Sequence, residues 1–298
     1  MSETRLEGLP EGWELRSISV ASADRKLNLF VNQFVRTNIA GAARVLFIVH
    51  GQGEHGARYS HFPHYLNDSV DAVICMDHRG HGRSQGARGH VDHFEDYVED
   101  AYSVLQATVL EFTSRDTGRP PKIHLFGHSM GGLISLLMLQ QKSVVFLKSA
   151  TISAPLLELK YPVPAIKKAA GHILSQFLGG LQMETGLDAS LISHDPEVVQ
   201  AYLDDPLVHS KATTRFFTEM TGAIKVARSR ASGISVPIKF IIPMADGLVS
   251  PQAALEFYSR LENPNKSLTK LDGFYHESFN ELEKQRAFDE LRSWIKSH

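Results

Sequence analysis

The chain has 298 residues, of which 43% are hydrophobic, so it is long enough to bury a sizeable core. Lysine and arginine total 31 against 33 aspartates and glutamates, and the net charge of −2 excludes the basic surplus typical of nucleic-acid-binding proteins. The single cysteine, Cys75, excludes an internal disulfide and lies in an apolar run that indicates a buried thiol. We see no signal-peptide pattern and no apolar run long enough to span a bilayer. We therefore expect a cytoplasmic protein that at most lies on a membrane surface.

Strand and helix patterns alternate along most of the chain, which predicts a mostly parallel sheet covered by helices on both faces. Expected strands are residues 13–20, 27–35, 44–50, 71–76, 123–126, 145–153, 238–243 and 267–271. The first expected helix begins at a capping box formed by Asp92 and Glu95. The other expected helices cover residues 133–139, 251–261 and 278–296. Ligands bind such sheets at the carboxyl ends of their strands, so polar residues that follow strands are the first candidates for a site.

One strand pattern runs into the sequence Gly127-His128-Ser129-Met130-Gly131, and an apolar helix pattern follows directly. This is the strand, turn and helix arrangement of a G-x-S-x-G nucleophile elbow, in which only glycines fit beside the serine. The start of the following helix would stabilise a developing oxyanion there. The alternative is a glycine-rich turn whose serine merely caps the helix. The context favours Ser129 as a nucleophile.

A nucleophilic serine needs a base and an orienting acid, which in this kind of elbow protein follow it in the order acid, then histidine. Asp246 directly follows the strand pattern at 238–243, and His276 follows the last strand pattern. We predict that His276 takes the proton of Ser129 and that Asp246 orients the imidazole. Asp272 is the competing acid, but its closeness to His276 in the sequence favours a role in the turn.

The reaction also needs two backbone N–H donors for the oxyanion. One is expected from Met130, the residue after the nucleophile, and the other from Gln52 in the glycine-rich loop after the strand at 44–50. The alternative for that loop is a glycine turn without a ligand.

Four motifs together resemble the monoglyceride lipase and lysophospholipase branch of the α/β-hydrolase superfamily. They are HGQGEHGARY at 50–59, DHRGHGRSQG at 77–86, GHSMGG at 127–132 and LDASLISHDPEVVQAYLDDPLVH at 187–209. The resemblance implies an α/β-hydrolase fold with a mostly parallel eight-stranded sheet flanked by helices. It also implies Ser129, Asp246 and His276 as the catalytic triad, with the amides of Gln52 and Met130 as the oxyanion hole.

The resemblance further suggests that Glu54 and Arg58 line the alcohol side of the site and that Tyr202 reaches in from a cap. The alternative for Glu54 and Arg58, which are four residues apart, is an ion pair on the surface of a helix. The sequence departs from the family at Pro243, where glycine is common, and at Phe279, where a second histidine is common.

Residues 154–233 interrupt the alternation of strands and helices, which predicts a helical cap inserted after the sixth strand. The hydrolase core is then formed by residues 1–153 and 234–298, in a single domain overall. The early cap carries an apolar helical stripe that includes Ile173 and Phe177. This stripe either contacts lipid, in the pocket or at a membrane interface, or packs as ordinary cap core.

The sequence therefore predicts a serine carboxylester hydrolase that cleaves single-chain acyl lipids, monoacylglycerols first, through an acyl-enzyme on Ser129 and without a metal or cofactor. Its expected partners are a small lipid substrate and a membrane surface contacted through the cap, with no nucleic acid and no obligate protein partner. Lysophospholipase, general carboxylesterase and acyltransferase activities are the alternatives on the same triad. A non-catalytic ligand-binding protein on this fold is a more remote one.

Overall fold

An eight-stranded, mostly parallel sheet forms the centre of the protein, as the sequence predicts. The computed structural model describes residues 8–39, 41–114, 117–161, 175 and 178–298. The strands, in their order across the sheet, are β1 (Trp13–Ala21), β2 (Asn28–Arg36), β4 (Ala72–Met76), β3 (Arg44–Val49), β5 (Lys122–His128), β6 (Leu147–Ser153), β9 (Ile238–Pro243) and β10 (Lys266–Leu271). The pairs β1–β2 and β2–β4 are antiparallel, and all other neighbours are parallel.

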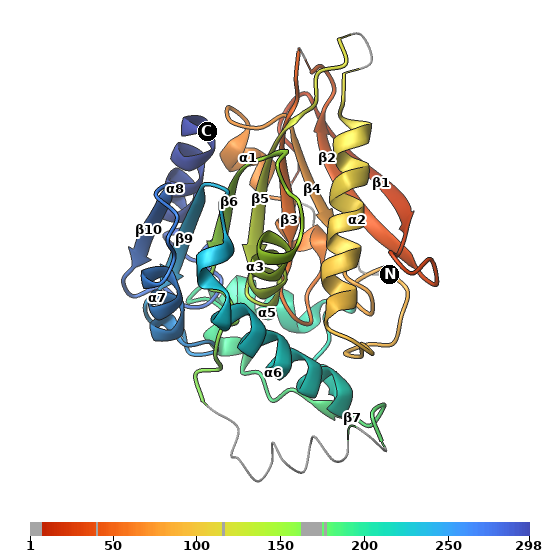
Figure 1. The fold of residues 1–298 in the computed structure, drawn as a ribbon, viewed down its shortest axis with the longest axis vertical. Helices are drawn as coiled ribbons and strands as arrows, with labels where there is room; N and C mark the ends of the chain where they lie inside the picture. The colour runs from red at the N-terminus through yellow and green to blue at the C-terminus, as the bar shows by residue number, and fades with distance from the viewer. Residues whose placement is uncertain (1–7, 40, 115–116, 162–174, 176–177) are drawn as a thin grey trace.

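Helices cover both faces of this sheet, which explains the continuous apolar runs of its central strands. Along β3, Val45, Phe47 and Val49 pack into one core, whereas Leu46 and Ile48 pack into the other. Helices α2 (Glu95–Glu111), α3 (Met130–Gln141), α6 (Thr214–Ser229) and α7 (Pro251–Ser259) contribute to the first core. Helices α1 (Phe62–Leu66) and α8 (Lys284–Ser297) contribute to the second (Figure 1).

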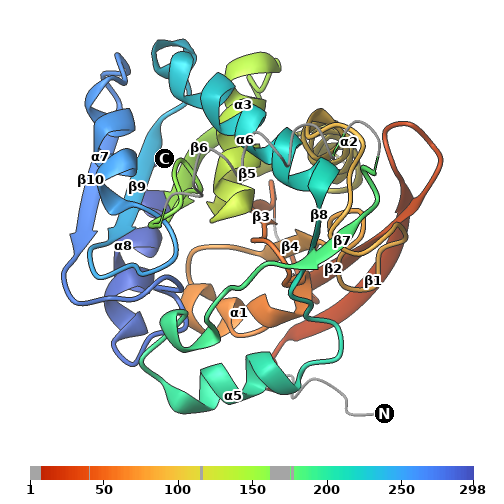
Figure 2. The same ribbon diagram turned by 90° about the horizontal axis from the view of Figure 1, so that it is seen from below.

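Residues 154–233, here called the insert, connect β6 to β9 in the sequence, and the described elements among them lie across one end of the sheet (Figures 1 and 2). Its described elements are α5 (Pro196–Asp204), α6 (Thr214–Ser229), the short paired strands β7 (Gln182–Glu184) and β8 (Lys211–Thr213), and single 3₁₀ turns at Ala189–Leu191 and Ala231–Gly233. Ile173 and Phe177, for which the sequence leaves open lipid contact or ordinary cap packing, lie outside the described residues. Within the described part of the chain, no helix is both long and apolar enough to cross a membrane.

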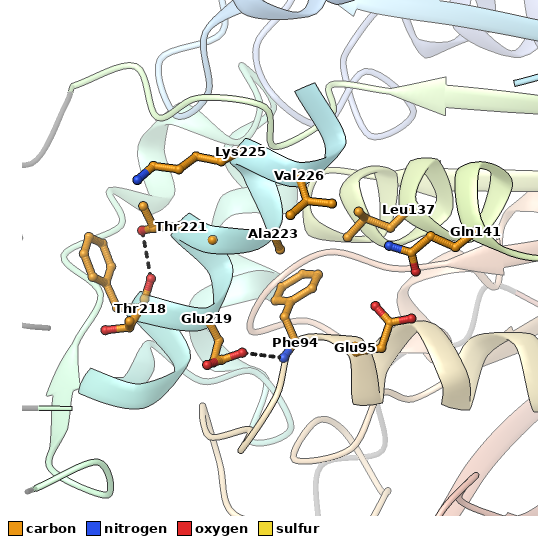
Figure 3. Close-up of a pocket in the computed structure, with 12 residues that line it drawn as sticks. Phe94, Glu95, Leu137, Gln141, Thr218, Glu219, Thr221, Ala223, Lys225 and Val226 are labelled. Atoms are coloured by element: carbon orange, nitrogen blue, oxygen red, sulfur yellow. Dashed lines mark hydrogen bonds between the residues drawn. The ribbon is translucent and has the colours of Figure 1, made fainter. Parts of the chain in front are cut away.

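The predicted capping box at the start of α2 is wrong. The helix begins at Glu95, and Asp92 lies three residues before it with an exposed side chain. The N–H of Phe94 instead donates to Oε2 of Glu219 on α6, at 3.1 Å (Figure 3). A carboxylate supplied by the insert therefore satisfies a free N–H group that the local sequence was expected to satisfy.

The closing helix α8 also begins later than predicted, at Lys284 rather than near residue 278. Glu281, just before it, accepts N–H bonds from Tyr275 at 2.8 Å and from His194 of the insert at 3.2 Å. These bonds hold residues 278–283 as a turn against the loop that carries His276, so the helix starts after them.

Candidate active site

Ser129 lies at a sharp turn between β5 and α3. Its φ of 54° and ψ of −117° are a strained conformation for a residue other than glycine. Neighbouring glycines are required by close contacts, because a side chain at Gly131 would come within 1.9 Å of the Val49 carbonyl oxygen. A side chain at Gly127 would come within 2.4 Å of the Ser135 hydroxyl. The turn thus has the conformation expected of a nucleophile elbow.

His276 and Asp246 form a buried hydrogen-bonded pair. Nδ1 of His276 lies 2.7 Å from Oδ2 of Asp246. The other carboxylate oxygen accepts the N–H groups of Leu248 at 2.8 Å and Val249 at 3.0 Å, which fixes its orientation. Asp272, the competing acid, lies exposed in the turn after β10. The structure therefore brings the predicted acid and base together.

The pair stabilises the charge on each of its members. Burial opposes ionisation of Asp246, but the neighbouring His276 and two backbone N–H bonds hold the pKa of that carboxyl below its ordinary value. Burial also opposes the imidazolium form of His276, but the charge of Asp246 and its hydrogen bond raise the pKa of His276. The rings of His276 and His128 are 4.8 Å apart, and His128 directly precedes Ser129, so the base lies beside the elbow.

The loop after β3 also lies against Ser129, because a side chain at Gly51 would be 3.2 Å from its Cβ. The N–H of His78 donates to Nε2 of His50 at 3.1 Å, so the proton of neutral His50 is on Nδ1, which lies 2.8 Å from the Gly51 carbonyl oxygen. Burial lowers the pKa of His50 well below its ordinary value and keeps the ring neutral. Because the Gly51 carbonyl and the Gln52 N–H share one planar peptide, this bond orients the predicted oxyanion donor.

Arg58 lies between two buried carboxylates, so the alternative of an ion pair on the surface of a helix is wrong. Its Nη1 donates to Glu54 Oε2 at 2.8 Å, and Nη1 and Nη2 donate to the two oxygens of Glu277 at 2.8 and 2.7 Å. All three side chains are less than 10% exposed. Burial raises the pKa of Glu54, whereas the Arg58 contacts overcome the burial of Glu277 and lower its pKa to about 2.

This network connects the two loops that flank Ser129. Glu54 Oε1 accepts the Gly51 N–H at 2.5 Å and the Tyr59 hydroxyl at 2.9 Å, and Glu277 directly follows His276. Sequence reasoning missed Glu277, although its position beside the candidate base was a usable signal. The guanidinium of Arg58 also lies 4.9 Å from the ring centre of Tyr202, on α5 of the insert.

Glu54, Arg58 and Tyr202 therefore lie together, and their contact with substrate stays a prediction. Phe279, where relatives often have a second histidine, is buried in the aromatic cluster around Phe62. It supplies no polar group to the site.

A separate cavity of about 730 Å³ lies among α6, α2 and the end of α3 (Figure 3). Phe94, Leu137, Phe217 and Val226 form much of its apolar wall, and none of the three predicted triad residues lines it. Over the described ranges, no three histidine, cysteine or acidic side chains are grouped to hold a metal ion.

Comparisons with known proteins show the family to which the chain belongs. The family model described as serine aminopeptidase (Hydrolase_4) matches residues 40–283. A monoacylglycerol lipase of Mycolicibacterium smegmatis is 31% identical over 255 residues, which cover 85% of this chain and 88% of that relative. Phospholipase YtpA of Bacillus subtilis is 26% identical over 84% of this chain and 94% of its own length. The crystal structure of the Paleococcus ferrophilus monoacylglycerol lipase superimposes with a TM-score of 0.75, at 26% identity, over 96% of this chain and 99% of that one.

Proposed function

Since the chain belongs to the serine aminopeptidase (Hydrolase_4) family of α/β-hydrolases and is a lipase- or esterase-type hydrolase, we propose that it cleaves monoacylglycerols to glycerol and fatty acid. The observation that carries the proposal is the 2.7 Å contact between His276 and Asp246 beside the strained turn at Ser129. This combination supplies a nucleophile, a base and an orienting acid, the set that acyl transfer requires.

In the proposed mechanism, Ser129 attacks the ester carbonyl while His276 takes its proton. Asp246 holds the imidazole and stabilises the imidazolium that forms. The N–H groups of Gln52 and Met130 stabilise the oxyanion of the tetrahedral intermediate. His276 then protonates the leaving alcohol, and water hydrolyses the acyl-enzyme on Ser129 by the reverse sequence of proton transfers.

The charges of the Arg58 network favour binding of a neutral glycerol head group rather than the phosphodiester of a lysophospholipid. Two carboxylates, Glu54 and Glu277, already occupy the guanidinium, so in their ionised forms the buried trio carries a net negative charge. An incoming phosphate would be repelled and would find its cation already engaged. Glycerol hydroxyls carry no charge and can hydrogen-bond to Glu54 and Tyr202.

A hydrolysis panel tests this choice. Monoacylglycerol and lysophosphatidylcholine of the same acyl chain, with a short p-nitrophenyl ester, separate the head-group preference from general esterase activity. Preferred cleavage of the lysophospholipid would contradict the monoacylglycerol assignment while leaving the triad assignment intact.

The triad is tested with fluorophosphonate labelling. Ser129→Ala should fold, lose covalent labelling and lose several orders of magnitude in turnover, because only the oxyanion hole and substrate binding would then contribute. Asp246→Asn should reduce turnover far more than the matched Asp272→Asn, because only Asp246 holds the His276 tautomer. Equal losses in the two aspartate variants would mean that the acid is wrongly assigned.

We further propose that the insert contacts the lipid surface from which the substrate is drawn. Leu178, Leu181 and Met183 follow one another closely on the insert and are each roughly half exposed. Leu181→Asp with Met183→Asp should reduce sedimentation with lipid vesicles and hydrolysis of long-chain monoacylglycerol, while sparing a short soluble ester. Equal loss on both substrates would instead indicate ordinary packing of the insert.

A further inference from the structure

The insert holds the loop that carries the predicted oxyanion donor. Backbone N–H of His209 donates to the Gly53 carbonyl at 2.9 Å. The side-chain amide of Gln52 donates to the Lys211 carbonyl at 3.3 Å. Both bonds cross from the hydrolase core to the stretch that runs from the end of α5 to the first residue of β8, so the two residues after Gly51 each have a partner in the insert.

A buried pair anchors this stretch at its beginning. Oδ2 of Asp205 lies 2.9 Å from Nε2 of His55, and their side chains are 6% and 1% exposed. Its other oxygen accepts the Leu207 N–H at 2.8 Å, which shapes the turn that leads to His209. Asp205 therefore connects the fold of the insert directly to the loop beside Ser129.

At Gly53 the backbone of the loop after β3 lies in close contact with the backbone of the insert at His209. The residue has a φ of +77°, and a side chain there would come within 2.4 Å of the His209 carbonyl oxygen. Because the backbones meet so closely, a shift of this part of the insert has to move the loop at Gln52 and Gly53 or break these bonds.

We propose that residues 205–211, here called the docking segment, position residues 51–53, here called the oxyanion loop. The placement of the insert then controls how well the Gln52 N–H is aligned with the oxyanion. Oxyanion donors work only at about 2.7–3.1 Å from the developing charge, and small misplacements reduce the rate strongly. The inference rests on the proposed function, because it assigns a role in the same acyl-transfer reaction. Asp205 and His209 are positioning residues, since they act through Gln52 and Gly53.

The test compares Asp205→Ala with Asp204→Ala. Asp204 is the neighbouring exposed acid, and it accepts a hydrogen bond from Gln200 on its own helix rather than from the oxyanion loop. We expect Asp205→Ala to lower kcat for a short p-nitrophenyl ester about 10- to 100-fold, with little change in KM. Asp204→Ala should behave like the wild-type protein.

A thionoester of the same acid and alcohol supplies the readout that a merely structural role would not change. A thiocarbonyl sulfur accepts hydrogen bonds weakly, so the oxyanion hole accelerates its reaction less. The ratio of ester to thionoester kcat/KM should therefore fall in Asp205→Ala. An unchanged ratio, whether both substrates lose activity equally or neither loses any, would overturn the inference. If Asp205→Ala does not fold, Asp205→Asn, which conserves the shape of the side chain, is measured with the same ratio and the same criteria.

Wild-type hydrolysis that depends on Ser129 is measured first. Its absence would contradict the proposed function and this inference with it. Normal wild-type hydrolysis with an unchanged ratio in the Asp205 variant would contradict the inference alone.

Discussion

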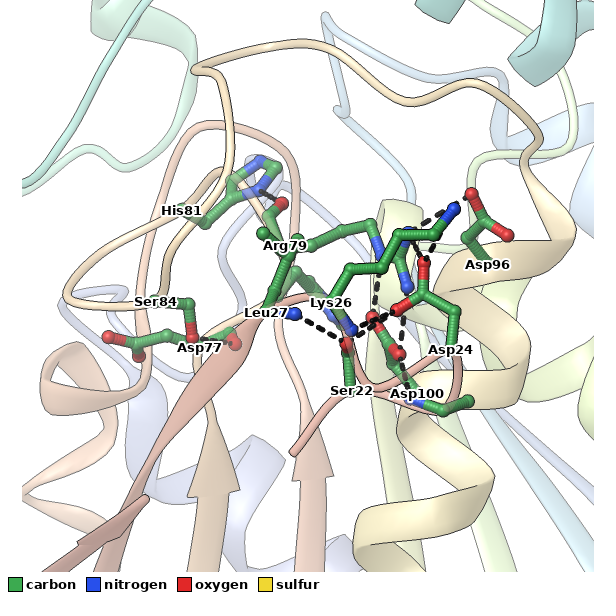
Figure 4. A network of polar contacts seen from close by, with 12 residues as sticks. Ser22, Asp24, Lys26, Leu27, Asp77, Arg79, His81, Ser84, Asp96 and Asp100 are labelled. Atoms are coloured by element: carbon green, nitrogen blue, oxygen red, sulfur yellow. Dashed lines mark hydrogen bonds and ion pairs between the residues drawn. The ribbon is translucent and has the colours of Figure 1, made fainter. Parts of the chain in front are cut away.

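Two buried arginines, Arg58 and Arg79, lie in the loops after β3 and β4 and have the same chemistry but connect different parts of the molecule. Each side chain is 9% exposed and contacts carboxylates. Arg58 joins the loop beside Ser129 to the loop that carries His276. Arg79 joins the turn between β1 and β2 to helix α2 (Figure 4). We therefore expect that the segments an ion pair connects, rather than its chemistry, determine whether it affects the reaction.

The two networks also differ in how far water reaches them. Around Arg79, Asp100 is fully buried and accepts two bonds at 2.7 and 3.0 Å, whereas the side chains of Asp24 and Asp96 are 32% and 27% exposed. Around Arg58, both carboxylates are buried. The outer part of the Arg79 network is therefore screened by solvent, and the Arg58 network is not.

The largest expected effect is that of Arg58→Met, which leaves Glu54 and Glu277 buried without a cation. Breaking such a buried group typically lowers the free energy of unfolding by about 3–5 kcal/mol. We also expect kcat/KM for a short ester to fall about 100-fold or more, because both loops beside Ser129 lose their shared partner. Urea denaturation and ester kinetics at a temperature where the variant is folded measure the two effects. Full activity in the folded variant would show that this network is only structural.

The matched variant Arg79→Met should lose about as much free energy of unfolding as Arg58→Met, but should keep its activity. It leaves Asp100 buried, and among the described residues its remaining partner is the Ala23 N–H at 2.8 Å. Burial already raises the pKa of Asp100. We expect the free energy of unfolding to fall by about 3–5 kcal/mol, with kcat within about twofold of the wild-type value below the melting transition. A loss of kcat as large as that of Arg58→Met would remove the distinction between the two networks.

The sequence predicted the sheet well because its strands are buried on both faces and read as continuous apolar runs. Strand β9 has the predicted bounds, and β3 differs from its prediction by one residue. The prediction from the sequence failed at the start of α2, because the partner of the Phe94 N–H is Glu219, 125 residues away in the sequence. No local pattern could have indicated that contact.

In the candidate site, too, the residues that follow local patterns could be predicted, and those defined by distant contacts could not. Ser129, Asp246 and His276 could be proposed because each follows a strand pattern in a fixed chain order, and their roles in catalysis stay predictions. The spacing of Glu54 and Arg58 instead left a surface pair open beside the role implied by the resemblance, because a spacing of four residues is also typical of a helix face. Glu277, the partner that makes the pair part of a buried network, is 219 residues from Arg58 and could not be assigned from spacing.

A smaller effect is expected on the pH dependence. His276 acts as a base only when neutral, so kcat/KM should fall as the pH drops through its pKa, which lies above the ordinary value of about 6.5. The charge of Glu277 contributes to that raised pKa, although less than Asp246 does. Glu277→Gln should therefore move the acid limb of the kcat/KM profile to lower pH, by several tenths of a unit to about one unit.

The control for this shift is Asp96→Asn, which removes a charge from the Arg79 network. Its acid limb should coincide with that of the wild-type protein, because Asp96 contacts Arg79 rather than His276. A shift of equal size in both variants would indicate a general effect of net charge. A shift of Glu277→Gln to higher pH would contradict the assignment of His276 as the base.

The smallest effect should come from Asp24→Asn, at the exposed edge of the Arg79 network. The closest oxygen of Asp24 is 3.6 Å from Arg79, at a site that water reaches, so the pair should contribute at most about 1 kcal/mol to the free energy of unfolding. Because exposed pairs are screened by ions, the difference from the wild-type protein should shrink when urea denaturation is repeated in about 1 M salt. The effect of Arg79→Met should persist in the same salt, since Asp100 is fully buried. A large, salt-independent loss in Asp24→Asn would mean that the outer carboxylates stabilise the hairpin as strongly as the inner one, and the contrast in solvent screening between the two networks would then be wrong.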